Sequence, residues 1–137
     1  SVEMSEKQIV SVYESYGSRK LIHNMLRAYI SPSMGEHSID GIFTSSDHLA
    51  TIVQEELEEM GKRVPEDIQI IGYDGLQFLN QGKPIVSSIA QPVHEIAKEA
   101  VRCLNELIAN GKTEGNTKIP VSFQEGPTTK TLVTEEK

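Results

Sequence analysis

The chain has 137 residues, which is enough for one ordinary domain with a single core. Its hydrophobic fraction of 37% and charged fraction of 24% exclude disorder along the whole length, and its net charge of -7 disfavours binding of a nucleic-acid backbone by this segment itself. No apolar run approaches the about 18 residues of a membrane span, and the N-terminus lacks the layout of a signal peptide, so we expect a cytoplasmic protein with no membrane partner.

Hydrophobic spacing predicts two helices and two short strands in the first half of the chain. Apolar residues recur at helical spacing over about 15–30. The apolar run 39–44 predicts a strand that leads through a small polar triplet into a second helix, which starts near Asp47 and ends near Gly61 at a left-handed position. A second strand is predicted over 68–71 and is expected to stop at the next glycine.

The second half of the chain predicts two more strands on either side of a long helix. The polar loop 73–84 is long enough to be functional, and residues 85–90 form the third predicted strand. After Pro92, a broad apolar stripe predicts a helix that ends at Gly111. Alternation of apolar and polar residues over 119–123 predicts a final strand of the edge type.

The order helix, strand, helix, strand, strand, helix, strand favours an α/β fold. We expect an open, mostly parallel, doubly wound sheet with helices on both faces. In such sheets ligands bind beyond the carboxyl ends of the strands. The candidates for a binding site are therefore the polar residues that directly follow the strands: Ser46, Asp47, Tyr73, Asp74 and Gln91.

Three of these residues have a structural explanation beside the functional one. Asp47 stands where a helix N-cap is favoured, but an ionised carboxylate can also accept hydrogen bonds from ligand hydroxyls. Asp74 opens a YDG turn, and Gln91 could either fix its own loop or bridge a neutral polar ligand. Together, three such side chains at the ends of three strands are harder to explain by capping alone, and they predict half of a cleft for a small hydroxylated molecule.

Signals for catalysis, cofactors and metals are weak. The chain contains no GxGxxG motif, no GxxxxGK motif followed by Ser or Thr, and no GxSxG motif. The four histidines lack zinc-ligand spacing, and neither His48 nor His94 accompanies a nucleophile motif. Cys103 lies among apolar helical positions, where a small buried hydrophobe is expected. We therefore expect a protein that is not an enzyme and that uses no cofactor.

Four strings carry a family resemblance: IDGIFTSSDHLA, GKRVPEDIQIIGYDG, VSSIAQPVHEIAKEAV and IPVSFQEGPTT. From Tyr13 to Thr129 the chain resembles the C-terminal part of the effector-binding core of LacI/GalR (lactose/galactose repressor) transcription regulators. The resemblance implies a periplasmic-binding-protein-like fold, with two similar α/β lobes and the effector between them. Residues 1–137 would be the C-terminal effector-binding and dimerisation part of a longer protein, without the DNA-binding domain and most of the N-terminal lobe.

The resemblance places ligand-binding positions at six residues: Asp74, Asp47, Gln91, Ser46, Val93 and Val12. The two carboxylates would receive ligand hydroxyls, and the glutamine would reach the ligand from the crossover between the lobes. The two valines stand where some members carry an aromatic ring. The helix after Gln91 would belong largely to the missing lobe, so we expect its apolar stripe to lack cover and to be hidden by self-association or by exchange of this helix between chains.

The implied function is that of a sugar-responsive regulatory module. Its partners would be a sugar or phosphosugar effector, a second copy of itself in a homodimer, and operator DNA through the missing N-terminal domain alone. The family also includes members with a purine or phosphoprotein effector. An extracytoplasmic sugar-uptake binding protein is the nearest alternative. A phosphoacceptor receiver domain shares the length and the pattern, but its Mg²⁺ needs an acidic pair after the first strand, which is missing before Asp47.

Overall fold

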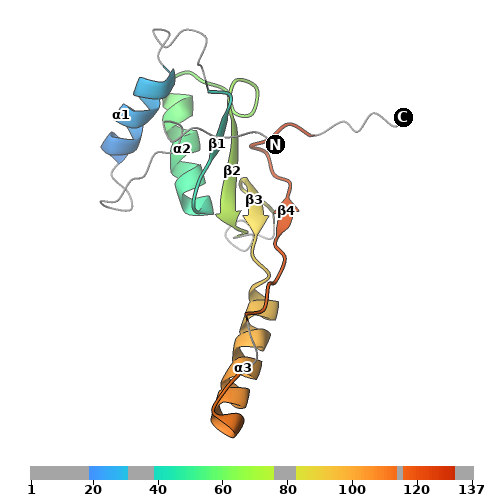
Figure 1. Ribbon diagram of the computed structural model, residues 1–137. Coiled ribbons are helices and arrows are strands. Elements are labelled where there is room, and N and C mark those ends of the chain that lie inside the picture. Colours follow the sequence, from blue (N-terminus) through green and yellow to red (C-terminus); the bar gives the residue numbers. More distant parts are fainter. Residues whose placement is uncertain (1–18, 31–38, 76–82, 114–115, 132–137) are drawn as a thin grey trace.

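The computed structural model describes residues 19–30, 39–75, 83–113 and 116–131. Within these ranges the helices and strands follow one another in the order that the sequence predicts (Figure 1). The elements are α1 (Arg19–Ile30), β1 (Gly41–Phe43), α2 (Asp47–Glu59), β2 (Gln69–Asp74), β3 (Ser87–Ala90), α3 (Val93–Asn110) and β4 (Ser122–Gln124).

The four strands form one open sheet in the order β1-β2-β3-β4. The first three strands run parallel, and β4 pairs antiparallel with β3 at the edge. This arrangement confirms a mixed α/β fold with a mostly parallel sheet. Because the carboxyl ends of β1, β2 and β3 lie at the same edge, the residues that follow these strands gather along one rim.

The second strand is longer than the sequence predicts, and its expected end at Gly72 is wrong. The parallel ladder continues past this glycine, because Gly72, Tyr73 and Asp74 pair with Ser88, Ile89 and Ala90 of β3. Tyr73 and Asp74 are therefore strand residues, whereas the sequence places them in a loop. Residues 76–82 of the predicted loop lie outside the described part of the chain.

Helix α2 packs against β2 on one face of the sheet, and α1 packs against α2 (Figure 1). The helical periodicity of both sequences places apolar residues of each helix on the side that faces the core. The buried apolar side chains are Ile22, Leu26, Ala50, Val53, Leu57, Ile68, Ile70 and Val86. Gly61 ends the turn after α2 with a φ of +75°, as expected for a left-handed position.

The opposite face of the sheet carries aromatic side chains from several strands. Phe43 and Tyr73 meet edge to face, with ring centroids 6.5 Å apart and an interplanar angle of 77°. Phe123 of β4 is paired with Ile89 of β3, and both Phe43 and Phe123 are exposed. In the ranges that the structure describes, helices cover only the α2 side, so the expected cover of this second face is not among the described residues.

Helix α3 leaves the rim of the sheet and extends away from it (Figure 1). None of its residues is buried, because α3 makes no extensive contact with any other helix or strand in the described part of the chain. The expected small buried hydrophobe at Cys103 is therefore wrong in this structure: its side chain is only half-buried. The helix ends at Gly111 with a φ of +68°, as predicted. Its exposed apolar side chains are Val93, Ile96, Val101, Leu104, Leu107 and Ile108.

The segment after β4 runs back to the sheet and forms hydrogen bonds with β2 and β3. The backbone N–H of Ile70 donates to the Thr128 carbonyl at 2.9 Å. The Thr128 hydroxyl donates to the Ile70 carbonyl at 2.7 Å and accepts from the Ser87 N–H at 2.8 Å. Thr128 thus occupies the position beside β2 just before β3 begins. No helix in the described ranges has the length and hydrophobicity needed to cross a membrane.

Candidate functional site

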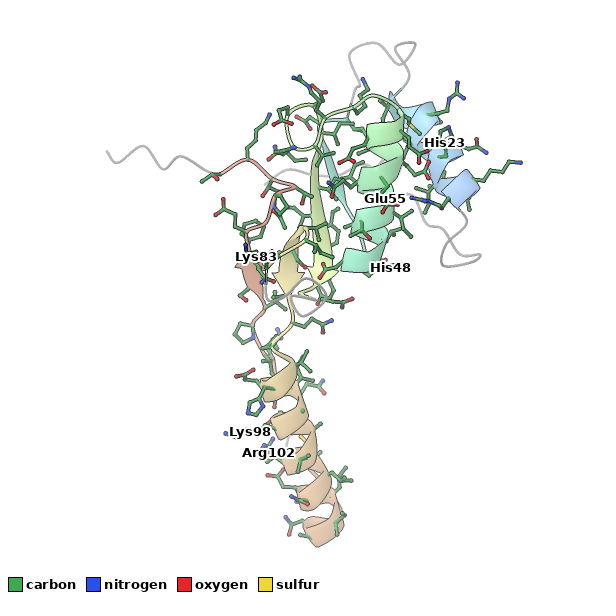
Figure 2. All side chains as sticks on the ribbon, turned by 180° about the vertical axis from the view of Figure 1, so that it is seen from behind. His23, His48, Glu55, Lys83, Lys98 and Arg102 are labelled. Atoms are coloured by element: carbon green, nitrogen blue, oxygen red, sulfur yellow. The ribbon has the colours of Figure 1, made fainter. Side chains whose placement is uncertain are left out.

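The predicted site residues lie along the rim where the parallel strands end. Asp74 is the last residue of β2, Gln91 follows β3, and Asp47 begins α2 shortly after β1. Figure 2 shows His48, the neighbour of Asp47, at the end of α2 that faces toward α3. Three positions that are far apart in the sequence are thus brought to one edge of the sheet.

Asp74 and Gln91 are joined directly. The Gln91 side-chain amide donates to Asp74 Oδ1 at 2.7 Å, and the Gln91 backbone N–H donates to the Asp74 carbonyl at 3.2 Å. Both side chains are half-buried, so they keep a surface toward solvent. A carboxylate has about four lone-pair positions, so Asp74 can accept hydrogen bonds from a ligand while it holds Gln91.

The backbone at Asp74 is strained. Its φ is +111°, a region that side chains other than glycine rarely adopt. The next residue, Gly75, has a φ of +77°, and a Cβ there would lie 2.6 Å from the Cβ of Ala90. The turn therefore requires glycine at this position, both for its backbone angle and for the close approach of β3.

Asp47 is almost completely buried, with 2% of its surface exposed. Its Oδ1 accepts a hydrogen bond of 2.5 Å from the Ser88 hydroxyl of β3. Gly72 leaves room for this carboxylate, because a Cβ on Gly72 would lie 2.4 Å from Asp47 Oδ1. The helix cap is the preceding residue, Ser46, whose Oγ accepts from the Leu49 N–H at 3.2 Å. The N-cap explanation thus applies to Ser46 and not to Asp47.

Ser88 connects the buried carboxylate with the turn after Asp74. Its Oγ accepts a hydrogen bond of 3.2 Å from the Gly75 N–H and donates to Asp47. The structure therefore links Asp47, Ser88 and Gly75 into one chain of contacts next to the Asp74–Gln91 pair. Sequence reasoning missed Ser88 and Gly72. The available signals were two serines inside a predicted strand and a glycine inside a strand, which often marks a close approach.

The remaining predicted residues contribute less to this rim. Val93 is the first residue of α3 and is 68% exposed, and its backbone N–H donates to the Gln91 carbonyl at 2.9 Å. Val12 lies outside the described residues. In the described ranges, no group of three or more His, Cys, Asp and Glu side chains is placed to hold a metal ion.

The rim can bind a ligand that offers hydroxyl hydrogens. Asp74 presents an acceptor, and Gln91 presents an amide that can both donate and accept. The arrangement therefore suits recognition of a polar molecule through hydrogen bonds.

Comparison with known proteins shows which protein family this chain resembles. Residues 3–129 match the family model of the periplasmic binding protein-like domain. The ribose operon repressor of Halalkalibacterium halodurans is 39% identical over 67 residues, which cover 49% of this chain and 20% of that protein.

Two solved structures with a bound sugar are also similar. A LacI family transcriptional regulator from Arthrobacter sp. FB24 in complex with lactose has a TM-score of 0.63 and 30% identity, covering 82% of this chain and 40% of that one. A LacI family transcriptional regulator from Enterococcus faecium with bound ribose has a TM-score of 0.59 at the same identity and coverage. The chain thus spans less than half of the length of each of these relatives.

Proposed function

Because the chain belongs to the periplasmic binding protein-like domains of LacI-type regulators, we propose that it is the C-terminal effector-binding and dimerisation part of a DNA-binding regulator of sugar metabolism. Its effector is a sugar or a phosphosugar. Asp74 and Gln91 contact the effector directly, and Ser46, Asp47 and Val93 belong to the same side of the site. Val12 stays a ligand-binding position that the family resemblance implies.

The observation that carries this proposal is the Asp74–Gln91 pair at the rim of the sheet. A carboxylate that is already held by an amide is oriented before the ligand arrives, which reduces the entropy lost on binding. Vicinal hydroxyls of a sugar donate to such a carboxylate and exchange hydrogen bonds with such an amide. The relatives with bound lactose and ribose support a carbohydrate as the ligand class.

The rim supplies one side of a binding cleft. Helix α3 extends past it with an exposed apolar stripe, and this stripe needs cover from a second lobe or from a second chain. Closure of two lobes around the effector stabilises one arrangement of a homodimer. The effector changes the affinity for operator DNA only through its different affinity for the two arrangements.

The operator is bound by a separate N-terminal domain of the whole protein, because the chain itself carries a net charge of -7. The repressor function of the ribose-operon relative supports regulation in the cytoplasm, without catalysis, over sugar uptake outside it. A sugar-uptake binding protein would use the same rim but would have no operator to release.

The test is calorimetric titration of the whole protein with ribose, sucrose, lactose and their phosphates. Asp74→Asn keeps the shape and the acceptor for Gln91 but removes the charge. Asp40→Asn makes the same chemical change at an exposed residue before β1, at the opposite end of the sheet. We expect about tenfold or greater weakening for Asp74→Asn, the size of one charged hydrogen bond, and unchanged binding for Asp40→Asn. Equal affinity of the two variants, or no binding of any of these sugars, would overturn the proposal.

A further inference from the structure

We propose that Asp47 and Ser88 are positioning residues, which hold Asp74 in its ligand-binding geometry without touching the ligand. The inference rests on the proposed function, since it concerns the same rim. It gives Asp47 a different role from the direct ligand contact that the family resemblance implies. A chain of hydrogen bonds from Asp47 through Ser88 to the backbone of Gly75 supports this positioning role.

Neighbouring residues hold Asp74 from both sides. With a φ of +111°, its backbone does not keep this conformation without external support. On the β3 side, Gln91 holds both the carbonyl and the carboxylate of Asp74. On the exit side, the chain turns at Gly75, whose N–H donates to Ser88 Oγ at 3.2 Å. The direction of the Asp74 side chain is thus fixed from both ends of the residue.

Asp47 orients the Ser88 hydroxyl. A serine hydroxyl has one proton to donate and two lone pairs that accept. Asp47 Oδ1, at 2.5 Å, takes the proton, so a lone pair of Ser88 is available for the Gly75 N–H. Without the carboxylate, the hydroxyl could rotate and present its proton to that N–H instead. Asp47 therefore acts on the turn by setting the direction of the Ser88 hydroxyl.

Asp47 itself does not reach the ligand, because its carboxylate is buried. Only 2% of the residue is exposed, and its carboxylate lies over Gly72, where a side chain would collide with it. It also belongs to the first turn of α2, whose N-terminal dipole stabilises a negative charge. Burial, a neutral donor and the helix dipole thus hold the carboxylate inside the sheet edge, below the surface that Asp74 and Gln91 present.

The experiment is a double-mutant cycle in the whole protein, with the sugar that calorimetry identifies as the probe. Asp47→Ala removes the acceptor for the Ser88 hydroxyl, and Ser88→Ala removes that hydroxyl, so each variant interrupts the chain of hydrogen bonds. If Asp47 acts through Ser88, each variant weakens binding by about tenfold and the double variant is no weaker than either single one. If Asp47 contacts the sugar itself, the two losses multiply, and the proposal is overturned.

Ser87→Ala provides the matched control. Ser87 is equally buried in the same strand, but its hydroxyl donates to the Gly126 carbonyl at 3.0 Å and serves the returning C-terminal segment. Its loss should lower stability and leave sugar affinity unchanged. A general structural weakening would instead reduce affinity in Ser87→Ala and Ser88→Ala alike, which would also overturn the proposal.

A spectroscopic measurement covers the case in which a variant fails to fold and needs no sugar. In the unsubstituted protein, the Gly75 amide should exchange slowly with solvent. In Ser88→Ala and Asp47→Ala, its proton resonance should move in the same direction. Rapid exchange of this amide would contradict the chain of hydrogen bonds from Asp47 through Ser88 to Gly75. If Asp74→Asn loses sugar binding while Ser88→Ala binds normally, only the positioning role of Asp47 and Ser88 is rejected. If Asp74→Asn binds sugar normally, the proposed function itself is rejected.

Discussion

Gln91 bonds to Asp74 with both its side chain and its backbone, at 2.7 Å from Nε2 to Oδ1 and at 3.2 Å from N to the carbonyl oxygen. The ends of two neighbouring parallel strands are thus locked to each other at the residues that the sequence proposes for ligand binding. The strain at Asp74 and the close packing around Gly72 make this rim sensitive to small substitutions.

The strained backbone of Asp74 can be measured with two substitutions. Asp74→Ala and Asp74→Gly both remove the carboxylate and its bond to Gln91, but only glycine adopts a φ of +111° without strain. We expect Asp74→Ala to be less stable than Asp74→Gly by about 1 kcal/mol or more, the usual cost of such a conformation. Urea unfolding of the two variants gives this difference directly. Equal stability would show that the backbone at this residue is relaxed.

The space above Gly72 is reserved for the carboxylate of Asp47. In Gly72→Ala, the added Cβ would lie 2.4 Å from Asp47 Oδ1 and 3.1 Å from Asp47 Cα, so either the side chain or the helix start must move. We expect a loss of about 1–3 kcal/mol, as for other overpacked sites. Gly41→Ala is the control, because no atom lies within 4 Å of its Cβ position. A Gly72→Ala protein as stable as Gly41→Ala would contradict the packing described.

The sequence predicts only part of this rim, because sequence patterns mainly relate residues that are close to each other in the chain. The order of the elements follows from hydrophobic spacing, and the helix ends at Gly61 and Gly111 follow from the conformational freedom of glycine. Asp74 and Gln91 could be placed at one edge because parallel strands end together. Each of these inferences uses residues that are close in the sequence or a general rule of sheet topology.

The contact between Asp47 and Ser88 could not be found in the same way. It joins residues 41 positions apart and depends on the register in which β2 and β3 pair. A shift by one residue would turn Ser88 to the other face of the sheet. The burial of Asp47 likewise depends on a missing side chain at Gly72. The true end of β2 has the same origin, since the ladder with β3 extends it beyond the apolar run.

The returning C-terminal segment places a buried hydroxyl between β2 and β3. Thr128 is completely buried, and its Oγ1 bridges the Ile70 carbonyl and the Ser87 N–H. Thr128→Val keeps the shape but leaves both backbone groups without their partner, so we expect a loss of about 1–3 kcal/mol for each group. Thr131→Val is the control, because its hydroxyl bonds to Glu125 on the surface. Thermal unfolding should separate the two valine variants clearly, and a Thr128→Val protein with an unchanged midpoint would argue against the bridge.

Two neighbouring glutamates on α2 test how burial changes the contribution of an ion pair to stability. Both pair with Arg19 of α1, but the Glu56 side chain is 5% exposed and the Glu55 side chain 59%. Glu56 Oε2 also lies 2.8 Å from His23 Nδ1; His23 on α1 and Glu55 on α2 can be followed in Figure 2. Glu56→Ala should cost about 1.5–3 kcal/mol, as for buried bonds to charged groups, and Glu55→Ala about 0.5 kcal/mol or less. Equal losses in denaturant titrations would contradict this difference.

Glu99 gives α3 a dependence on pH. Hydrogen bonds from Arg102, followed by one from Thr117, lower the pKa of this carboxyl from 4.5 to about 2. Because the pKa is lower in the folded state, the stabilising contribution is complete above the unfolded value and is lost as the pH falls through the folded value. The midpoint difference between the unsubstituted protein and Glu99→Gln should therefore shrink between about pH 5 and about pH 2. In an Arg102→Gln background this dependence on pH should be weaker, because the larger cause of the pKa shift is gone. A difference that stays constant over this range, or that persists undiminished without Arg102, would show that the ion pair does not support the helix in solution.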